Sequence, residues 1–271
     1  EEVITDEKWK CRRHPAFRSG KIEKVTGQLG FVFCFDARLD DEQWIMPEYD
    51  DSAWKNAVAA AKTVNGRERT LMPRPILHPN VSPRTDFKVV RQGFVMRERE
   101  HETFALTCKH DRVAFDDSFS GDEKSGFRFN GFPPGNDCNG AFLIADLGGE
   151  SAGFIDIELE APEGCVVDIS HGEHLTDGVV RHNIGGRNFT DRYICRNGLN
   201  RFYYQLRRIG GRYIQLTFTN LSGDLIVRYA GIRHVFYPLP EATPFHCDLP
   251  DAMRLRDVAI RTMELCMHDH Y

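Results

Sequence analysis

Short alternating or continuous apolar runs, bounded by Gly, Pro, Asn and Asp, recur along the chain before residue 250. This pattern is typical of β-sandwiches, and helical periodicity is scarce in the same region. In the clearest run, residues 153–161, apolar residues alternate with Asp156, Glu158 and Glu160, which predicts a strand with one face in solvent. Further strands are predicted at residues 30–35, 87–91, 102–107, 141–145, 165–170, 202–206, 212–218 and 225–235. The chain is therefore predicted to be mainly β.

Residues 161–164 have the composition of a turn, because Pro162 and Gly164 lie there between two predicted strands. We therefore predict that residues 153–161 and 165–170 form a hairpin.

A helical pattern occurs at residues 251–265, where apolar residues recur at roughly helical spacing. Pro250 and Asp251 are well suited to its first turn. The helix needs a partner for its apolar stripe, and the chain stops at Tyr271. Either the helix folds back on the preceding domain or its partner lies in sequence that is absent here. We expect the second, with the chain as a piece of a longer protein.

Prolines divide the pattern into parts. Pro238, Pro240 and Pro244 each remove a ladder donor, which predicts a boundary near residue 240. A weaker break is predicted at residues 64–86, where Gly66 and several prolines interrupt any ladder. The predicted architecture is two antiparallel, jelly-roll-like β-sandwich domains at residues 1–85 and 86–240, followed by a linker and a short C-terminal helix at residues 241–271.

Composition narrows the class of protein. With 271 residues and 41% hydrophobic content, the chain is long enough to bury one large or two medium cores. The net charge of -5, with scattered Lys and Arg, argues against nucleic acid or an anionic membrane as the main partner. No apolar run reaches the length of about 18 residues that a membrane-spanning helix requires.

Eight cysteines occur without any CxxC pair, so buried free thiols are the favoured interpretation. The segment from His171 to His174 places two imidazoles near Glu173, but it lacks the spacing of a helical zinc motif. His268 and His270 would diverge on a helix. We therefore predict no metal site and no cofactor.

Three acidic pairs are candidates for the two carboxylates of a glycoside hydrolase: Asp40–Asp41, Asp50–Asp51 and Asp116–Asp117. Adjacent strand residues point to opposite faces, however, and adjacent loop aspartates usually cap turns. The glycine pairs at 185–186 and 210–211 are interpreted as tight turns rather than phosphate cradles. The aromatics Trp44, Trp54, Tyr203 and Tyr204 can stack on sugars, but core packing is their default role. No catalytic residue is assigned, and the carbohydrate-binding residues stay unknown.

Several segments resemble known carbohydrate-active proteins. The string DDSAWKNA at residues 50–57 resembles a stretch of the galactose-binding-like domains that precede many glycoside hydrolase catalytic domains. An ordered series, at residues 146–150, 153–155, 161–164, 171–178, 191–194 and 210–214, resembles the bacterial α-L-rhamnosidase family. The resemblance covers residues 140–271 well and the N-terminal part loosely.

The resemblance implies a β-sandwich region that leads into an (α/α)6 catalytic barrel, with residues 249–271 similar to the first barrel helix. In that family the catalytic carboxylates lie in the barrel, so none is carried over to this chain. The implied parent enzyme removes terminal α-L-rhamnose from glycosides or polysaccharides by an inverting mechanism. A rhamnose-containing glycan is then its partner, and a periplasmic or secreted location is expected.

Two alternatives stay open from the sequence. One sandwich can act as a stand-alone carbohydrate-binding module, or both can brace the barrel without binding sugar. Exposed apolar surface on the terminal helix would favour a homodimer of the isolated chain.

Overall fold

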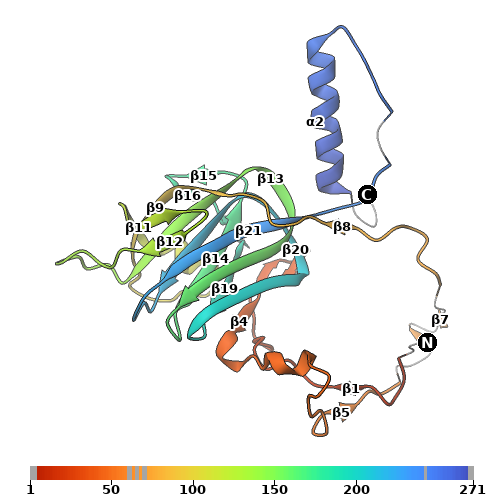
Figure 1. The fold of residues 1–271 in the computed structure, drawn as a ribbon, viewed down its shortest axis with the longest axis horizontal. Coiled ribbons are helices and arrows are strands. Elements are labelled where there is room, and N and C mark those ends of the chain that lie inside the picture. Colours follow the sequence, from red (N-terminus) through yellow and green to blue (C-terminus); the bar gives the residue numbers. More distant parts are fainter. Residues whose placement is uncertain (1–4, 60–62, 65–66, 69–71, 241–242, 268–271) are drawn as a thin grey trace.

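The computed structural model describes residues 5–59, 63–64, 67–68, 72–240 and 243–267. An 11-stranded sheet dominates it, with the strand order β11-β12-β21-β13-β20-β14-β19-β4 and with β8, β9 and β10 attached beside this path. A C-terminal helix follows (Figure 1). The predicted mainly β class with a C-terminal helix is confirmed.

Two long strands, β13 (Gly140–Ala161) and β20 (Gly198–Thr219), run through the whole sheet and pair with each other. Their pairing register shifts between Asp146 and Ser151 of β13, which separates each strand into two halves. One half of β13 pairs with β9, and the other half pairs with β21. The predicted pairs of strands at 141–145 and 153–161, and at 202–206 and 212–218, are therefore halves of two continuous strands.

The halves belong to two layers. The first layer contains β4 (Cys34–Asp36), β9 (Lys88–Met96), β10 (Arg112–Phe115), β14 (Val166–Gly172) and β19 (Thr190–Ile194). The second layer contains β8 (Asn80–Val81), β11 (Phe119–Asp122), β12 (Gly126–Phe129) and β21 (Ile226–Phe236).

A single contact shows that the layers face each other. Strands β11 and β20 are four positions apart in the sheet, which would separate them by about 19 Å if the sheet were flat. The rings of Phe119 in β11 and Phe218 in β20 nevertheless lie 5.9 Å apart. The sheet therefore folds back on itself as a sandwich, and its interior holds the main apolar core, which includes Leu143, Ile157 and Leu216.

The sequence prediction of a strand at 102–107 is wrong, because residues Phe104–His110 form helix α1. Thr103 caps this helix by accepting a hydrogen bond from the Leu106 N–H at 3.1 Å. The buried residues of α1 are Phe104, Ala105, Thr107 and Cys108, a helical spacing that the alternating interpretation overlooked. Phe104 packs with residues of β4 on the outer face of the first layer.

The predicted hairpin of residues 153–161 with 165–170 is also wrong. Strand β14 pairs with β19 and β20, and the second half of β13 pairs with β20 and β21. Residues 162–165 therefore cross from the second layer to the first. The composition of the segment predicted the change of direction correctly but gave no information on which strands pair.

The N-terminal part consists of short elements: β1 (Lys10–Cys11), β2 (Lys24–Thr26), β3 (Gly30–Phe31), 3-10 helices η1 (Ala37–Leu39) and η2 (Glu42–Ile45), β5 (Lys55–Asn56), β6 (Thr63–Val64) and β7 (Arg67–Glu68). Strand β4 joins the first layer by parallel pairing with β19, and β8 pairs with β21. Parts of residues 1–85 thus contribute strands to the large sheet. The domain boundaries at 85 and 240 stay predictions.

The remaining short strands follow β14 and cover the outer face of the first layer. They form two small hairpins, β15 (Leu175–Thr176) with β16 (Val179–Val180) and β17 (Asn183–Ile184) with β18 (Arg187–Asn188). Asp177 and Gly178 form the turn between β15 and β16, and both have positive φ, at 53° and 82°.

Helix α2 (Pro250–Cys266) confirms the predicted C-terminal helix, with Pro250 and Asp251 in its first turn. It stands upright beside the sandwich (Figure 1). The guanidinium groups of Arg208 and Arg261 hold it there by donating to the carbonyl oxygens of Leu265 and Glu150, both at 2.7 Å. Leu255 is 70% exposed, so the helix keeps apolar surface uncovered, and the homodimer stays a prediction. None of the helices in the described ranges is long and apolar enough to cross a membrane.

Candidate functional site

The outer face of the first layer carries polar residues, because they alternate with core residues along each strand. On β14, Val167 and Ile169 lie in the main core, whereas Asp168 and Ser170 point to the opposite face and are also fully buried. Helix α1 and the hairpin of β15 and β16 cover this face. Its polar groups are therefore buried between the sheet and these short elements.

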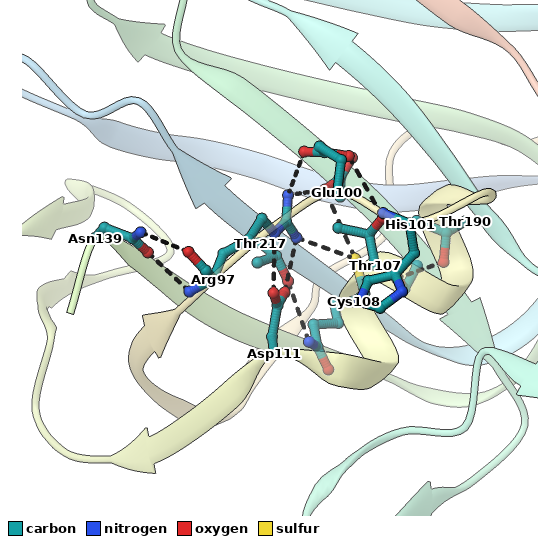
Figure 2. A network of polar contacts seen from close by, with 12 residues as sticks. Arg97, Glu100, His101, Thr107, Cys108, Asp111, Asn139, Thr190 and Thr217 are labelled. Atoms are coloured by element: carbon teal, nitrogen blue, oxygen red, sulfur yellow. Dashed lines mark hydrogen bonds and ion pairs between the residues drawn. The ribbon is translucent and has the colours of Figure 1, made fainter.

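Asp168 lies at the centre of a charged network, and Figure 2 labels Arg97, Glu100 and Asp111 of this network. Its carboxylate accepts hydrogen bonds from Arg97 at 2.7 Å and from Arg192 at 2.6 and 3.0 Å. Arg97 also donates to Asp111 at 2.7 and 2.9 Å, and Arg192 donates to Glu100. Asp111 follows α1 directly, so the network fastens the helix to the sheet.

The charges of this network are mutually satisfied. Burial raises the pKa of Asp111, although its contact with Arg97 opposes the rise. Burial also raises the pKa of the Cys108 thiol well above its usual value, and the charge of Asp168 adds to this effect. Each carboxylate here is engaged by an arginine, so the network has the character of a structural clamp rather than of an acid and base waiting for substrate.

Another perturbed carboxyl lies nearby, since burial raises the pKa of Glu23 to about 7. Its Oε1 accepts from the Phe104 N–H at 2.7 Å, at the N-terminus of α1. The negative charges of Asp168 and Asp191 add to this rise, and both of these carboxylates are bound to arginines. Within the described ranges, therefore, no second free carboxylate completes a glycosidase pair around Glu23.

A pocket of about 390 Å³ lies beside the network, between α1, β10 and the hairpin of β15 and β16. The amide of Gln215 reaches this pocket, but both of its ends are occupied. Its oxygen accepts from the Val180 N–H and its nitrogen donates to the Thr217 hydroxyl, each at 3.1 Å. Gln215 therefore already uses both ends of its amide within the protein.

A second group of pockets surrounds His171, the last-but-one residue of β14. One has a volume of about 270 Å³ and is lined by His171, Glu173, Phe189, Arg207 and Arg208, among others. An adjoining pocket of about 210 Å³ shares His171, Glu173 and Phe189 and adds His174. The histidine segment singled out from the sequence therefore does line a cavity.

The geometry argues against a metal there. The ring Nδ1 of His171 contacts the Gly210 carbonyl oxygen at 2.9 Å, and His174 contacts Arg181 at 3.2 Å. Burial, reinforced by the positive charge of Arg207, lowers the pKa of His171 to about 4, so its imidazole is neutral near pH 7. In the part of the chain that the structure describes, no three His, Cys, Asp or Glu residues cluster to hold an ion.

Arg207 and Arg208 reach this pocket through an irregularity of β20. Gly153 of β13 pairs with Ile209, and Ile155 pairs with Tyr204, so two steps along β13 correspond to five along β20. Consecutive strand residues normally point to opposite faces, but a bulge of this kind can turn both side chains toward one side. No sequence motif marked these arginines, and the only signal was the pair Gly210–Gly211 that follows them.

The acidic pairs behave mostly as local caps. Asp41 caps η2, Asp50 accepts from the Ser52 N–H at 2.9 Å, and Asp116 accepts from the Asp117 N–H at 2.8 Å. The Asp40 carboxylate lies 3.4 Å from the His14 imidazole. These positions agree with the turn and capping interpretation.

The predicted turn is confirmed for Gly185 and Gly186, which have positive φ. It is wrong for the pair at 210–211, which lies inside β20. A Cβ on Gly211 would approach the backbone of Gly172 to 3.0 Å, so glycine allows close strand packing there.

The aromatic candidates divide between core and surface. Tyr204 packs in the main core and lies 4.5 Å from the Phe33 ring, as the default interpretation predicted. Tyr203 lies beneath the guanidinium of Arg233 at 4.7 Å, and Trp54 beneath that of Arg12 at 4.5 Å. Trp44 is 43% exposed. His268 and His270 lie outside the described residues.

Known proteins share the fold of this chain. Residues 137–228 match the family model of the bacterial alpha-L-rhamnosidase concanavalin-like domain. This region is therefore a concanavalin-like β-sandwich. The match confirms, over these residues, the resemblance inferred from the sequence motifs. No curated protein matches the chain by sequence.

Solved structures share the fold over nearly the whole chain. A GH78 family rhamnosidase of Bacillus sp. GL1 matches 97% of this chain with a TM-score of 0.77 and 16% identity, over 46% of its own length. An α-L-rhamnosidase of Dictyoglomus thermophilum matches 98% of the chain with a TM-score of 0.56 and 17% identity, over 24% of its length. That of Streptomyces avermitilis, complexed with L-rhamnose, matches 98% with a TM-score of 0.58 and 15% identity, over 21% of its length. The chain thus spans less than half of each of these proteins.

Proposed function

We propose that this chain is the accessory β-sandwich portion of an α-L-rhamnosidase-like glycoside hydrolase. The observation that carries the proposal is the family match of residues 137–228. The parent enzyme would remove terminal α-L-rhamnose from glycosides or polysaccharides by an inverting mechanism. One carboxyl group would protonate the glycosidic oxygen while a second would activate water on the opposite face of the sugar.

The geometry of the described residues supports an accessory role for the chain itself. An inverting pair must leave room for a water molecule and must present one free acid and one free base to the sugar. The buried carboxylates Asp111, Asp168 and Asp191 are each bound to arginine. These groups hold the sandwich together, so the catalytic carboxylates are expected in another part of the parent protein.

The test is hydrolysis of a chromogenic α-L-rhamnoside by this chain and by the protein of the complete reading frame. An α-L-fucoside and a β-D-glucuronide serve as control substrates. Activity of the longer protein alone, restricted to the rhamnoside, is the expected result. Activity of the 271-residue chain would refute the accessory role, and a longer protein that cleaves only a control sugar would refute the rhamnose assignment.

A second candidate function is carbohydrate binding by the sandwich without catalysis. The polar pocket beside His171 is the observation that favours it, because it is lined by hydrogen-bonding side chains together with the ring of Phe189. The two functions are compatible, since an accessory domain can hold a glycan while another domain cleaves it.

A further inference from the structure

The pocket beside His171 contains an unusual concentration of unmet hydrogen bonds. In the described part of the chain, seven buried side-chain nitrogen or oxygen atoms have no hydrogen-bond partner. Three of them belong to residues that line this one pocket: His171 Nε2, Arg207 Nε and Arg208 Nε. A buried polar atom without a partner costs about 1 to 3 kcal/mol, so three at one place indicate that bound water or a ligand completes the site.

The hydrogen-bonding roles of these atoms restrict the ligand. A carbonyl oxygen only accepts, so the contact between His171 Nδ1 and the Gly210 carbonyl, at 2.9 Å, places the ring proton on Nδ1. His171 Nε2 is then an acceptor, whereas the Nε–H groups of Arg207 and Arg208 are donors. The ligand must therefore donate one hydrogen bond and accept others. Hydroxyl groups do both, but a carboxylate or a fully ionised phosphate only accepts.

The charges near the pocket also favour a neutral ligand. Arg207 forms an ion pair with the buried Asp191. Arg208 donates to the carbonyl oxygens of Val235 and Leu265, so its charge is not neutralised by an ion pair in the described structure. Glu173 lines the pocket as a negative group, and its charge helps to raise the pKa of the nearby Glu150. Within the lining of this pocket, the charge of Glu173 therefore offsets that of Arg208, which leaves no excess positive charge for an anion.

The size and the apolar wall of the pocket indicate a single sugar ring. Its volume of about 270 Å³ lies just below the range of about 300–1,000 Å³ that is typical for drug-sized ligands. Phe189, Ile209 and Leu29 also line the pocket and supply apolar surface. We propose that this pocket binds one neutral pyranose residue, whose hydroxyl groups bridge His171, Arg207 and Arg208 and whose apolar face packs on Phe189.

The proposal rests on the second candidate function, carbohydrate binding at this pocket, and takes rhamnose as a test sugar from the proposed parent enzyme. The binding experiment is a titration of the ¹⁵N-labelled chain with methyl α-L-rhamnoside, D-galactose and D-galacturonate, followed by amide chemical shifts. The backbone signals of Phe189 and Gly210 report on this pocket, and those of Gln215 and Thr217 report on the wider pocket as an internal control. Saturable shifts at Phe189 and Gly210 with a neutral sugar are expected.

Variants test the assigned contacts. Arg208→Met removes one donor and should weaken sugar binding at least tenfold, since a hydrogen bond to a charged group is lost. His171→Phe keeps a ring and removes the acceptor, with the same expected direction. Arg201→Met is the matched control, because Arg201 lies on the same strand with a side chain that is 67% exposed. The dispersion of the amide spectrum verifies that each variant is folded.

The wild-type titration decides the question even if a pocket variant fails to fold. Absence of shifts at Phe189 and Gly210 with every sugar would show that only water fills the pocket and would overturn the proposal. Tighter binding of galacturonate than of neutral sugars would overturn the neutral ligand. Equal weakening by Arg201→Met would overturn the assigned contacts. Rhamnoside hydrolysis by the longer protein is a separate readout, so binding and catalysis can fail independently.

Discussion

Replacing Asp168 by asparagine tests whether the buried charge network stabilises the sandwich. The substitution keeps the shape of the side chain but removes the negative charge that Arg97 and Arg192 share. Breaking a buried ion pair by removing one partner typically costs about 3–5 kcal/mol. Arg97 keeps Asp111, and Arg192 keeps Glu100, whose side chain is 52% exposed. We therefore expect a loss near the lower end of that range, about 3 kcal/mol.

Urea unfolding followed by tryptophan fluorescence measures this loss. With an m-value of about 3 kcal/mol/M, the midpoint should fall by about 1 M. The matched control is Asp224→Asn, because Asp224 pairs with Arg128 at the surface and its side chain is 94% exposed. A surface pair contributes about 0–1 kcal/mol, so this variant should unfold close to the wild type. Equal midpoints for the two variants would refute the stabilising role of the network.

Three further predictions concern pH, packing and thiol reactivity. Because the pKa of His171 is about 4 in the folded chain and about 6.5 when unfolded, acid below pH 6.5 protonates the unfolded state preferentially. Between pH 7 and 4, the free energy of unfolding of the wild type should therefore fall by up to about 3 kcal/mol more than that of His171→Gln. Urea unfolding at each pH measures both values, and an equal fall in the two proteins would contradict the prediction. Gly153→Ala should destabilise the chain by more than about 2 kcal/mol, since its Cβ would lie 1.8 Å from the Arg233 carbonyl oxygen. Gly149→Ala is the control: its Cβ would meet no atom within 4 Å, so the thermal midpoint should stay nearly unchanged. Titration with a thiol reagent should label the exposed Cys11 and Cys266 rapidly and the buried cysteines only after unfolding, and fast labelling of a buried thiol would refute the packing.

The strand pattern was readable from the sequence because side-chain alternation is a local property. Residues 153–161 alternate, and Ile155, Ile157 and Leu159 indeed lie in the core. Strand pairing is not a local property, so the crossing of residues 162–165 between layers could not be predicted from the alternation of side chains. Helix α1 was missed for a related reason. Its seven residues offer less than two full turns of periodicity, and the cap at Thr103 is a single residue.

Only some of the residues that line the pocket beside His171 could be predicted from the sequence. The segment of His171 and Glu173 contained residue types that attract notice, and its position at the end of a strand followed from the pattern of β14. Arg207 and Arg208 carried no such signal, because arginine in a strand usually faces solvent. Their approach to His171 depends on pairing between distant strands, in particular on the contact of Gly211 with Gly172.

The irregularity of β20 connects the fold with the proposed site. A regular strand would have placed Arg207 and Arg208 on opposite faces, with one of them directed into the apolar core at the cost of burying an unpaired charge. The extra residues between Tyr204 and Ile209 avoid this conflict, at the point where β20 passes from one layer to the other. Bulges persist where they direct a side chain to a task, because they otherwise weaken the ladder. The unpaired Nε atoms of both arginines are consistent with such a task, because a bulge that served only to relieve the core would have let them turn to solvent.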